Sequence, residues 1–209
     1  MIAIIDYTVG NLRSVANAFE HLGVQAFIAN RPDELREASA IVLPGVGAFA
    51  SGMSHLKRLG FDEALEREVR DGGKPFLGIC LGMQLLATRG MEHGAHAGLN
   101  WVSGTVELLR VPENSPQLRI PHIGWNDVQM VSEGGLFRGF TASEDFYFVH
   151  SYVLKPNDPA VVAGTCLHSE PFAAAIETAN ICAVQFHPEK SHRAGLQLLR
   201  NWAEMTGQC

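Results

Sequence analysis

The sequence is poor in cysteine, in basic residues and in long apolar runs, and each shortage excludes a class of protein. Its four cysteines, Cys80, Cys166, Cys182 and Cys209, lie far apart and form no C-x-x-C pair. This spacing suggests neither a zinc site nor a disulfide framework. The apolar start at residues 1–6 is too short for a signal peptide and lacks a basic flank, and no run approaches the roughly 18 apolar residues of a membrane span. We therefore expect a cytoplasmic protein.

Positive charge is scarce as well. The 209 residues include 16 Lys and Arg against 22 Asp and Glu, which gives a net charge of -6 without long runs of either sign. A surface that binds nucleic acid needs clustered positive charge to neutralise phosphates, so we expect no nucleic-acid partner. The hydrophobic content of 46% is enough for a full core, and no stretch reads as a linker. We expect one domain over residues 1–209.

In its first half the sequence alternates strand and helix patterns, which indicates a right-handed βαβ wind around a parallel sheet. The predicted elements are strands at 1–6, 25–28 and 40–43 and helices at 12–22, 32–37, 53–59 and 61–70. From Gly90 onward the pattern changes to short strands separated by turn residues, which predicts hairpins and antiparallel pairing. These later elements are strands at 101–110, 126–130, 146–149, 161–165 and 172–177, a loop at 111–119, a buried strand at 181–186 and a helix at 194–205.

A cysteine flanked by glycines stands where an apolar run near residue 76 passes into a helical pattern. A side chain at such a strand-to-helix turn is strained and projects from the sheet edge, so glycine is needed at Gly78 and Gly82, where a Cβ would meet neighbouring backbone. The amides and dipole of the following helix, expected to extend through Ala87, favour a thiolate. The spacing predicts that Cys80 is a nucleophile.

A cysteine nucleophile needs a base to take its proton and a group that orients the base. His187 and Glu189 follow the last buried strand, at the edge where open α/β sheets place their sites. Each residue also has an ordinary structural interpretation, because buried cysteines usually serve packing and most histidines are structural or on the surface. The order Cys, His, Glu on an alternating α/β chain favours catalysis by Cys80, His187 and Glu189.

Three features near the predicted nucleophile have two interpretations each. Val46 and Gly47 lie in a glycine-rich loop after the third strand, which is either an ordinary turn or a source of backbone N–H groups for a ligand. Gln84 follows Cys80 by one helical turn and faces either a polar substrate or solvent. Glu92 either binds a substrate ammonium group or merely solvates a loop.

Two histidines, His93 and His96, stand in a loop rich in glycine and alanine. No acidic or cysteine partner of suitable spacing accompanies them, so they do not indicate a metal site. We interpret both as surface residues and expect neither a metal nor a cofactor.

The segments at 78–84 and 187–189 resemble those of the triad, or class I, glutamine amidotransferases. Four further segments are similar to the HisH branch of that family, the glutaminase subunits of imidazole glycerol phosphate synthase. They are Asp6-Tyr7 with residues 10–14, then 44–47, 121–126 and 148–152. The similarity covers essentially the whole chain.

The resemblance implies a flavodoxin-like, three-layer α/β fold. A central mixed, mostly parallel sheet would be flanked by helices, with a more antiparallel, hairpin-rich C-terminal half. The implied activity is hydrolysis of glutamine to glutamate in histidine biosynthesis. The ammonia would pass to a (β/α)8-barrel cyclase of the HisF type, which makes imidazole glycerol phosphate and an aminoimidazole carboxamide ribotide.

The resemblance also implies a role for individual residues. Cys80 would form a glutamyl thioester, His187 would move protons and Glu189 would orient His187. The other implied roles are oxyanion stabilisation by Val46, Gly47 and the amide of Leu81, glutamine binding by Gln84, Glu92, Ser151 and Tyr152, and contact with the partner by Asn11, Pro121, Trp125, Tyr147 and Lys190. The first loop departs from the family at Thr8, where glycine is common.

Other functions are compatible with the same residues. The glutaminase could serve a sugar-amidating partner, or the chain could be a stand-alone cysteine hydrolase or peptidase. A non-catalytic binding module is disfavoured, because all three residue types of the triad are present.

Overall fold

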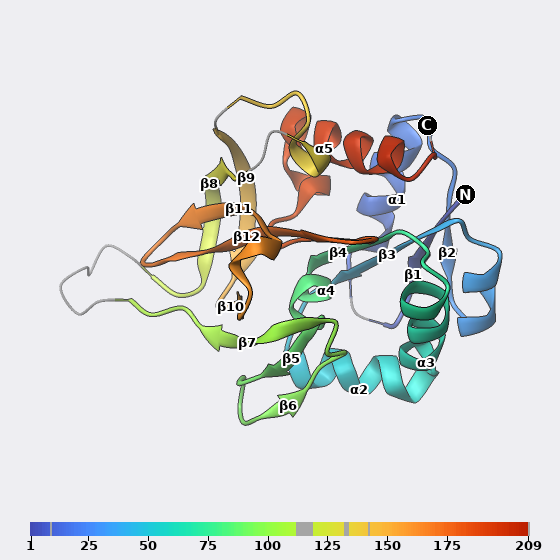
Figure 1. Cartoon of the computed structure of the whole chain (residues 1–209), viewed down its shortest axis with the longest axis horizontal. Coiled ribbons are helices and arrows are strands. Elements are labelled where there is room, and N and C mark those ends of the chain that lie inside the picture. The colour runs from blue at the N-terminus through green and yellow to red at the C-terminus, as the bar shows by residue number, and fades with distance from the viewer. Residues whose placement is uncertain (9, 112–118, 132–133, 142, 209) are drawn as a thin grey trace.

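The computed structural model describes residues 1–8, 10–111, 119–131, 134–141 and 143–208 (Figure 1). The loop expected at 111–119 falls mostly outside these residues, and Cys209 falls outside them entirely. Within the described part of the chain, no helix has both the length and the apolar character needed to cross a bilayer.

A nine-stranded sheet forms the centre of the molecule. In spatial order its strands are β2 (Ala26–Ala29), β1 (Ile2–Ile5), β3 (Ala40–Gly45), β4 (Phe76–Cys80), β13 (Ile181–Val184), β12 (Pro171–Thr178), β11 (Val162–Leu167), β8 (His122–Met130) and β9 (Ser143–His150). The pairings from β2 to β13 are parallel, and those from β13 to β9 are antiparallel. This confirms the predicted change of character between the two halves of the chain.

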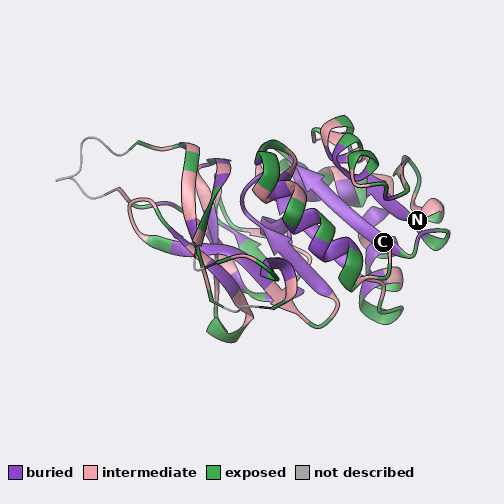
Figure 2. Cartoon of the chain, turned by 90° about the horizontal axis from the view of Figure 1, so that it is seen from above, coloured by how far each residue is buried: buried purple, intermediate pink, exposed green. Residues whose placement is uncertain are grey.

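Helices cover both faces of the parallel half (Figure 1). They are α1 (Leu12–His21) and α5 (His192–Met205) on one face, and α2 (Phe49–Leu59) and α3 (Phe61–Leu65) on the other. Side chains alternate along β1, so that Ile2 and Ile4 belong to the core under α1 and α5, while Ala3 and Ile5 belong to the core under α2 and α3. Figure 2 shows the central strands and the inner helix faces as buried. Each fully buried isoleucine contributes roughly 1.5–3 kcal/mol.

A second sheet of four strands packs against the α2 and α3 side. Its strands are β10 (Tyr152–Pro156), β7 (Val102–Leu108), β5 (Ala87–Gly90) and β6 (His96–Ala97). The sequence predicts only β7 of these. The helix predicted through Ala87 is too long, since α4 spans only Leu81–Gln84. Ala87 instead pairs with Val102 in the sheet, and this tertiary pairing overrides the local helix propensity.

The remaining elements are short turns of helix. They are η1 (Pro32–Arg36), the π-helical η2 (Glu66–Asp71), η3 (Gly135–Phe137), η4 (Pro159–Val161) and η5 (Pro188–Lys190). Element η5 follows β13, which lies beside β4, and β4 lies beside β3. The carboxyl ends of these three parallel strands therefore meet at one edge of the sheet.

Candidate active site

Cys80 stands at the end of β4 in a strained backbone conformation, with φ 55° and ψ -107°. Two glycines allow the chain to turn there, as the spacing predicts. A Cβ on Gly82 would lie 1.9 Å from the carbonyl oxygen of Leu43, and one on Gly78 would lie 2.8 Å from that of Gly82. A non-glycine residue with positive φ is strained and persists where the surrounding structure imposes it. The turn therefore holds the thiol at the sheet edge, with Cys80 5% exposed.

The helix after Cys80 is shorter than the sequence predicts, so its dipole stabilises a thiolate less than expected. Because α4 has four residues, few peptide dipoles are aligned behind the thiol. The expected help from a helix dipole is therefore small.

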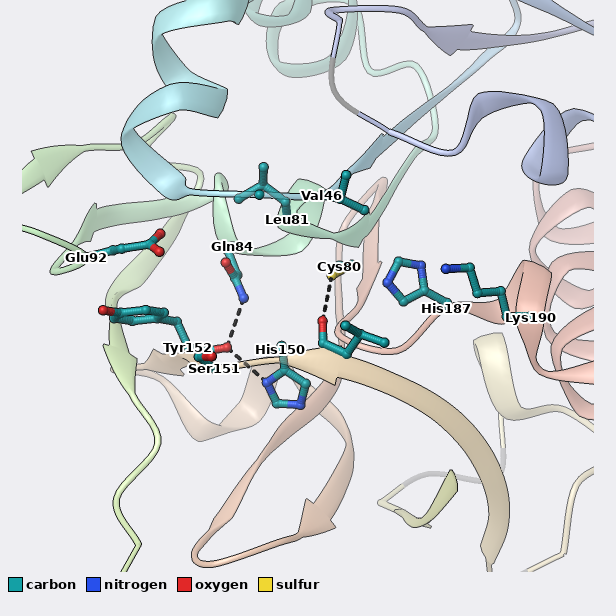
Figure 3. A pocket seen from close by; sticks show the side chains of 12 residues that line it. Val46, Cys80, Leu81, Gln84, Glu92, His150, Ser151, Tyr152, His187 and Lys190 are labelled. Carbon is teal, nitrogen blue, oxygen red and sulfur yellow. Dashed lines mark hydrogen bonds between the residues drawn. The ribbon is translucent and has the colours of Figure 1, made fainter. Parts of the chain in front are cut away.

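His187 and Glu189 lie at the start of η5, and the imidazole ring faces Cys80 (Figure 3). The distance from His187 Nδ1 to Glu189 Oε1 is 2.9 Å, and the two side chains are 4% and 1% exposed. Since the carboxylate accepts, Nδ1–H donates to Glu189, which leaves Nε2 to exchange a proton with the thiol. Burial alone lowers the pKa of His187, but its interactions with Cys80 and Glu189 outweigh burial and raise the pKa to about 9.

Strand β9 fixes the position of His187. The His187 N–H donates to the carbonyl of Tyr147 at 2.9 Å. The buried hydroxyl of Ser191 donates to the His187 carbonyl at 2.6 Å and accepts from the Tyr147 N–H at 3.0 Å. His187 is thus tied by its backbone to a strand of the antiparallel half.

A pocket of about 200 Å³ surrounds the thiol. This is smaller than the roughly 300–1,000 Å³ of a site for drug-sized ligands and suits a small metabolite. Ten of the predicted site residues line it, and they are Val46, Gly47, Cys80, Leu81, Gln84, Glu92, Ser151, Tyr152, His187 and Lys190. Val149 and His150 complete the lining. The structure therefore brings the catalytic, oxyanion and substrate-binding candidates together.

The candidates for substrate binding already have partners within the protein. Gln84 Nε2 donates to the carbonyl of Tyr152 at 2.9 Å, as Figure 3 shows. Glu92 accepts from the N–H of Phe49 at 2.7 Å, at the start of α2.

Among the oxyanion candidates, Gly47 in the loop between β3 and α2 has φ 97°, a conformation that favours glycine.

The partner-facing candidates lie outside the pocket, except Lys190. Trp125 of β8 pairs with Tyr147 of β9, and their rings are 6.0 Å apart. The Lys190 ammonium lies 5.9 Å from the Tyr147 ring, so these three side chains form one cluster. Asn11 and Pro121 are exposed on the surface.

Thr8, the departure from the family pattern, has φ 73°. This left-handed conformation is the physical reason for glycine at such a position. Thr8 is held there by its N–H, which donates to Asp6 Oδ1 at 2.9 Å.

Sequence reasoning missed three residues around the thiol, Gln185, Val149 and His150, and the histidine that His150 contacts, His122. The Gln185 amide donates to Cys80 Sγ, with Nε2 3.8 Å away, and the thiol faces the Val149 carbonyl at 3.9 Å. His150 lines the pocket and is hydrogen-bonded to His122, with 3.0 Å between their nitrogens. Gln185 was detectable as the one polar residue of an apolar strand segment. The histidine pair was not, because it depends on the register of β8 and β9.

Among the residues that the structure describes, Cys166, Cys182 and the two loop histidines form no competing site. Burial raises the pKa values of Cys166 and Cys182 to about 12, which keeps both thiols protonated and supports their interpretation as packing residues. His93 is exposed and His96 half-buried. Among the residues that the structure describes, no group of three or more His, Cys, Asp or Glu side chains is arranged to hold a metal ion.

Comparisons with known proteins agree on one family. The family model described as glutamine amidotransferase class-I matches residues 3–205. The chain is 46% identical over 205 residues to imidazole glycerol phosphate synthase subunit HisH 1 of Campylobacter jejuni subsp. jejuni, a match that covers 98% of this chain and 100% of that one. It is 47% identical over 208 residues to subunit HisH of Geobacter sulfurreducens, with 98% of each chain covered.

Solved structures share the fold at low sequence identity. A structure described as a glutamine amidotransferase has a TM-score of 0.76 at 19% identity, and the match covers 99% of this chain and 100% of that one. A structure described as a glutamine amidotransferase from Thermotoga maritima has a TM-score of 0.65 at 22% identity, with 99% and 81% covered. Likeness at this identity establishes the architecture alone.

Proposed function

Because the chain belongs to the class-I glutamine amidotransferases and, within them, to the HisH subunits, we propose that it is the glutaminase subunit of an imidazole glycerol phosphate synthase. The observation that carries this proposal is that Cys80 and His187 line one small pocket and that the His187 ring is hydrogen-bonded to the buried carboxylate of Glu189. The family match over residues 3–205 also supports the expectation of one amidotransferase domain.

The first half of the reaction forms a thioester. His187 Nε2 takes the thiol proton, and Cys80 Sγ attacks the side-chain carbonyl carbon of glutamine, forming a C–S bond. The resulting oxyanion lies near the backbone amides of Val46, Gly47 and Leu81, which stabilise it as fixed donors. His187 then gives its proton to the leaving nitrogen, and the C–N bond breaks to release ammonia.

The second half hydrolyses the thioester. His187 Nε2 takes a proton from water, the water oxygen attacks the thioester carbonyl, and the C–S bond breaks to give glutamate and Cys80. Glu189 accepts from Nδ1–H throughout and stabilises the imidazolium form of the ring. The raised pKa of His187, about 9, is consistent with a ring that holds a proton beside a thiolate.

Substrate recognition is assigned to the opposite wall of the pocket. Glu92 offers a carboxylate for the substrate ammonium group, and the backbone of Ser151 and Tyr152 offers further polar atoms. The Nε2 group of Gln84 already donates to Tyr152 and Gln185. Gln84 therefore meets glutamine with its acceptor oxygen, Oε1.

The surface next to the pocket exposes apolar side chains, which favours the proposal of a partner protein. It consists of Ile123 and Trp125 on β8 and Val149 on β9, which are 60%, 47% and 37% exposed, with Tyr147 beside Trp125. Contiguous exposed apolar side chains with an aromatic anchor are typical of a protein interface. Val149 also lines the pocket, so ammonia leaves the thiol beside this surface. A HisF-type (β/α)8 cyclase is the proposed occupant.

The test separates ammonia production from ammonia use. Purified with a HisF-type cyclase, the Cys80→Ser variant should lose glutamine-dependent synthesis of imidazole glycerol phosphate while keeping ammonia-dependent synthesis. Cys166→Ala, which removes a buried thiol outside the pocket, serves as the matched control and should keep both activities. Loss of both activities in Cys80→Ser would assign the cysteine a structural role instead.

A further inference from the structure

The thiol of Cys80 has a neutral hydrogen-bond donor besides the imidazole. The side chain of Gln185, which follows β13, is fully buried, and its Nε2 lies 3.8 Å from Sγ. An N–H group that donates to sulfur stabilises the thiolate more than the thiol. This donor matters because the helix that follows Cys80 has only four residues.

The direction of this hydrogen bond follows from a backbone carbonyl. The oxygen of Tyr152 can only accept, so the Gln84 atom 2.9 Å from it is the nitrogen Nε2. The same Nε2 lies 3.0 Å from Gln185, which must present its oxygen Oε1 there. The nitrogen of Gln185 consequently points to Cys80 Sγ.

A second chain of hydrogen bonds ends at the same carbonyl. His150 Nδ1 lies 3.1 Å from the Tyr152 oxygen and must donate, so its Nε2 accepts. That Nε2 lies 3.0 Å from His122 Nδ1, which therefore donates, and His122 Nε2 in turn accepts from Asn126 Nδ2 at 3.2 Å. His150 and His122 are 6% and 3% exposed, so water does not readily replace these bonds.

In both series of hydrogen bonds, the assignment of donors and acceptors is consistent from one end to the other. The carbonyl of Tyr152 receives one donor from Gln84 and one from His150, which orients both side chains. Gln84 cannot flip its amide without placing an acceptor against the carbonyl oxygen. A buried donor or acceptor left without its partner is costly, so the arrangement around Gln185 resists reversal.

We propose that Gln185 is a further catalytic residue, which stabilises the Cys80 thiolate by donating to Sγ. Gln84, the Tyr152 carbonyl and His150 are positioning groups that keep the Gln185 amide in the donating orientation. The inference rests on the proposed function of Cys80 as the nucleophile. Gln185, which follows β13, is thus a neutral hydrogen-bond donor to Sγ in addition to the His187 imidazole.

The test measures the thiolate directly and needs no glutamine. In the full-length chain, the alkylation rate of Cys80 by iodoacetamide is followed by mass spectrometry of the Cys80 peptide at pH 7 and pH 10. Gln185→Met keeps a similar length but removes the donor. We expect its alkylation to be about three- to tenfold slower at pH 7. At pH 10, above the ordinary thiol pKa of about 8.5, the difference should disappear.

A second variant keeps the shape of the side chain. Gln185→Glu can still accept from Gln84 but places a carboxylate oxygen against the sulfur, so it should slow alkylation at pH 7 at least as much. Asn201→Leu is the control, because Asn201 is also a buried amide but donates to the carbonyls of Leu136 and Arg138 instead. It should leave the rate unchanged at both pH values.

Two results would overturn the proposal. Equal rates at pH 7 for Gln185→Met and the parent chain would show that the donor has no effect on the thiolate. An equal slowing at pH 7 and pH 10 would show that Gln185 controls access to the sulfur. Neither result touches the glutaminase assignment, which fails if Cys80→Ser keeps glutamine-dependent synthesis or loses the ammonia-dependent synthesis as well.

Discussion

The two sides of the pocket are built in different ways. On the side of β3, β4 and α4, backbone geometry shapes the site, with a positive φ at Cys80 and glycines at 78 and 82 where no Cβ fits. On the side of β9 and β13, hydrogen bonds between buried side chains shape it, from Glu189 and His187 to Gln185 and His150. A substitution on the first side should therefore disrupt folding, while substitutions on the second side should reduce activity to different extents.

Glu189→Gln should have the largest effect on activity. The substitution keeps the size of the side chain but removes the negative charge that stabilises imidazolium and orients His187 through a 2.9 Å hydrogen bond. We expect the kcat of the glutaminase reaction to fall by about 10³- to 10⁴-fold, with cooperative unfolding retained. Steady-state kinetics with the cyclase complex measures this. A loss below tenfold would mean that the carboxylate does not orient the base.

Gly82→Ala tests the backbone side and should act on folding. Its Cβ would lie 1.9 Å from the carbonyl oxygen of Leu43, a backbone atom that cannot rotate away. We expect a loss of more than about 3 kcal/mol in the free energy of unfolding, measured by urea titration. Gly134→Ala is the matched control, since its Cβ would meet no described atom within 4 Å and its φ is -108°. It should change stability by less than about 0.5 kcal/mol.

The pH dependence of stability should have a contribution from His187. Its pKa is raised from 6.5 to about 9 in the folded chain, so the protonated ring adds stability that is fully present below pH 6.5. This stability is lost as the pH rises through about 9. The free energy of unfolding of the parent chain, measured by urea titration, should exceed that of His187→Asn by an amount that shrinks by roughly 3 kcal/mol over that range. A constant difference would contradict the raised pKa.

The contrast between the two sides explains what the sequence could predict. The strand-to-helix turn at Cys80 was predictable because Gly78, Cys80 and Gly82 lie close together in the sequence and their spacing expresses a local backbone constraint. His187 and Glu189 were predictable because both directly follow a buried strand and therefore lie at its carboxyl end. The relation of these residues to Cys80 followed from the order of parallel strands, which the alternation of strands and helices predicts.

The features that the sequence did not predict depend on pairings between segments that are distant in the sequence. His122 and His150 are opposite each other only because of the register of β8 and β9, which the sequence does not reveal. The helix expected through Ala87 failed for a similar reason. Its residues favour helix locally, but Ala87 finds a strand partner in β7. Side-chain networks and edge strands therefore need the three-dimensional structure.

The smallest effect is expected at the far end of the hydrogen-bonded chain. His122→Phe keeps a ring stacked near Phe148, 4.8 Å away in the parent chain, but removes the donor to His150. Since the change reaches Sγ only through His150, Tyr152, Gln84 and Gln185, we expect kcat to fall about two- to fivefold, within the energy of one neutral hydrogen bond.

His168→Phe provides the control for that small effect. His168 stacks on the same ring of His122 at 4.1 Å but hydrogen-bonds to the Arg119 carbonyl instead of the chain that leads to the thiol. Its kcat should stay unchanged in the same assay. Equal losses in the two variants would mean that packing around His122, rather than its donated hydrogen bond, supports the site. The two sides of the pocket would then both depend on shape, and the contrast between them would fail.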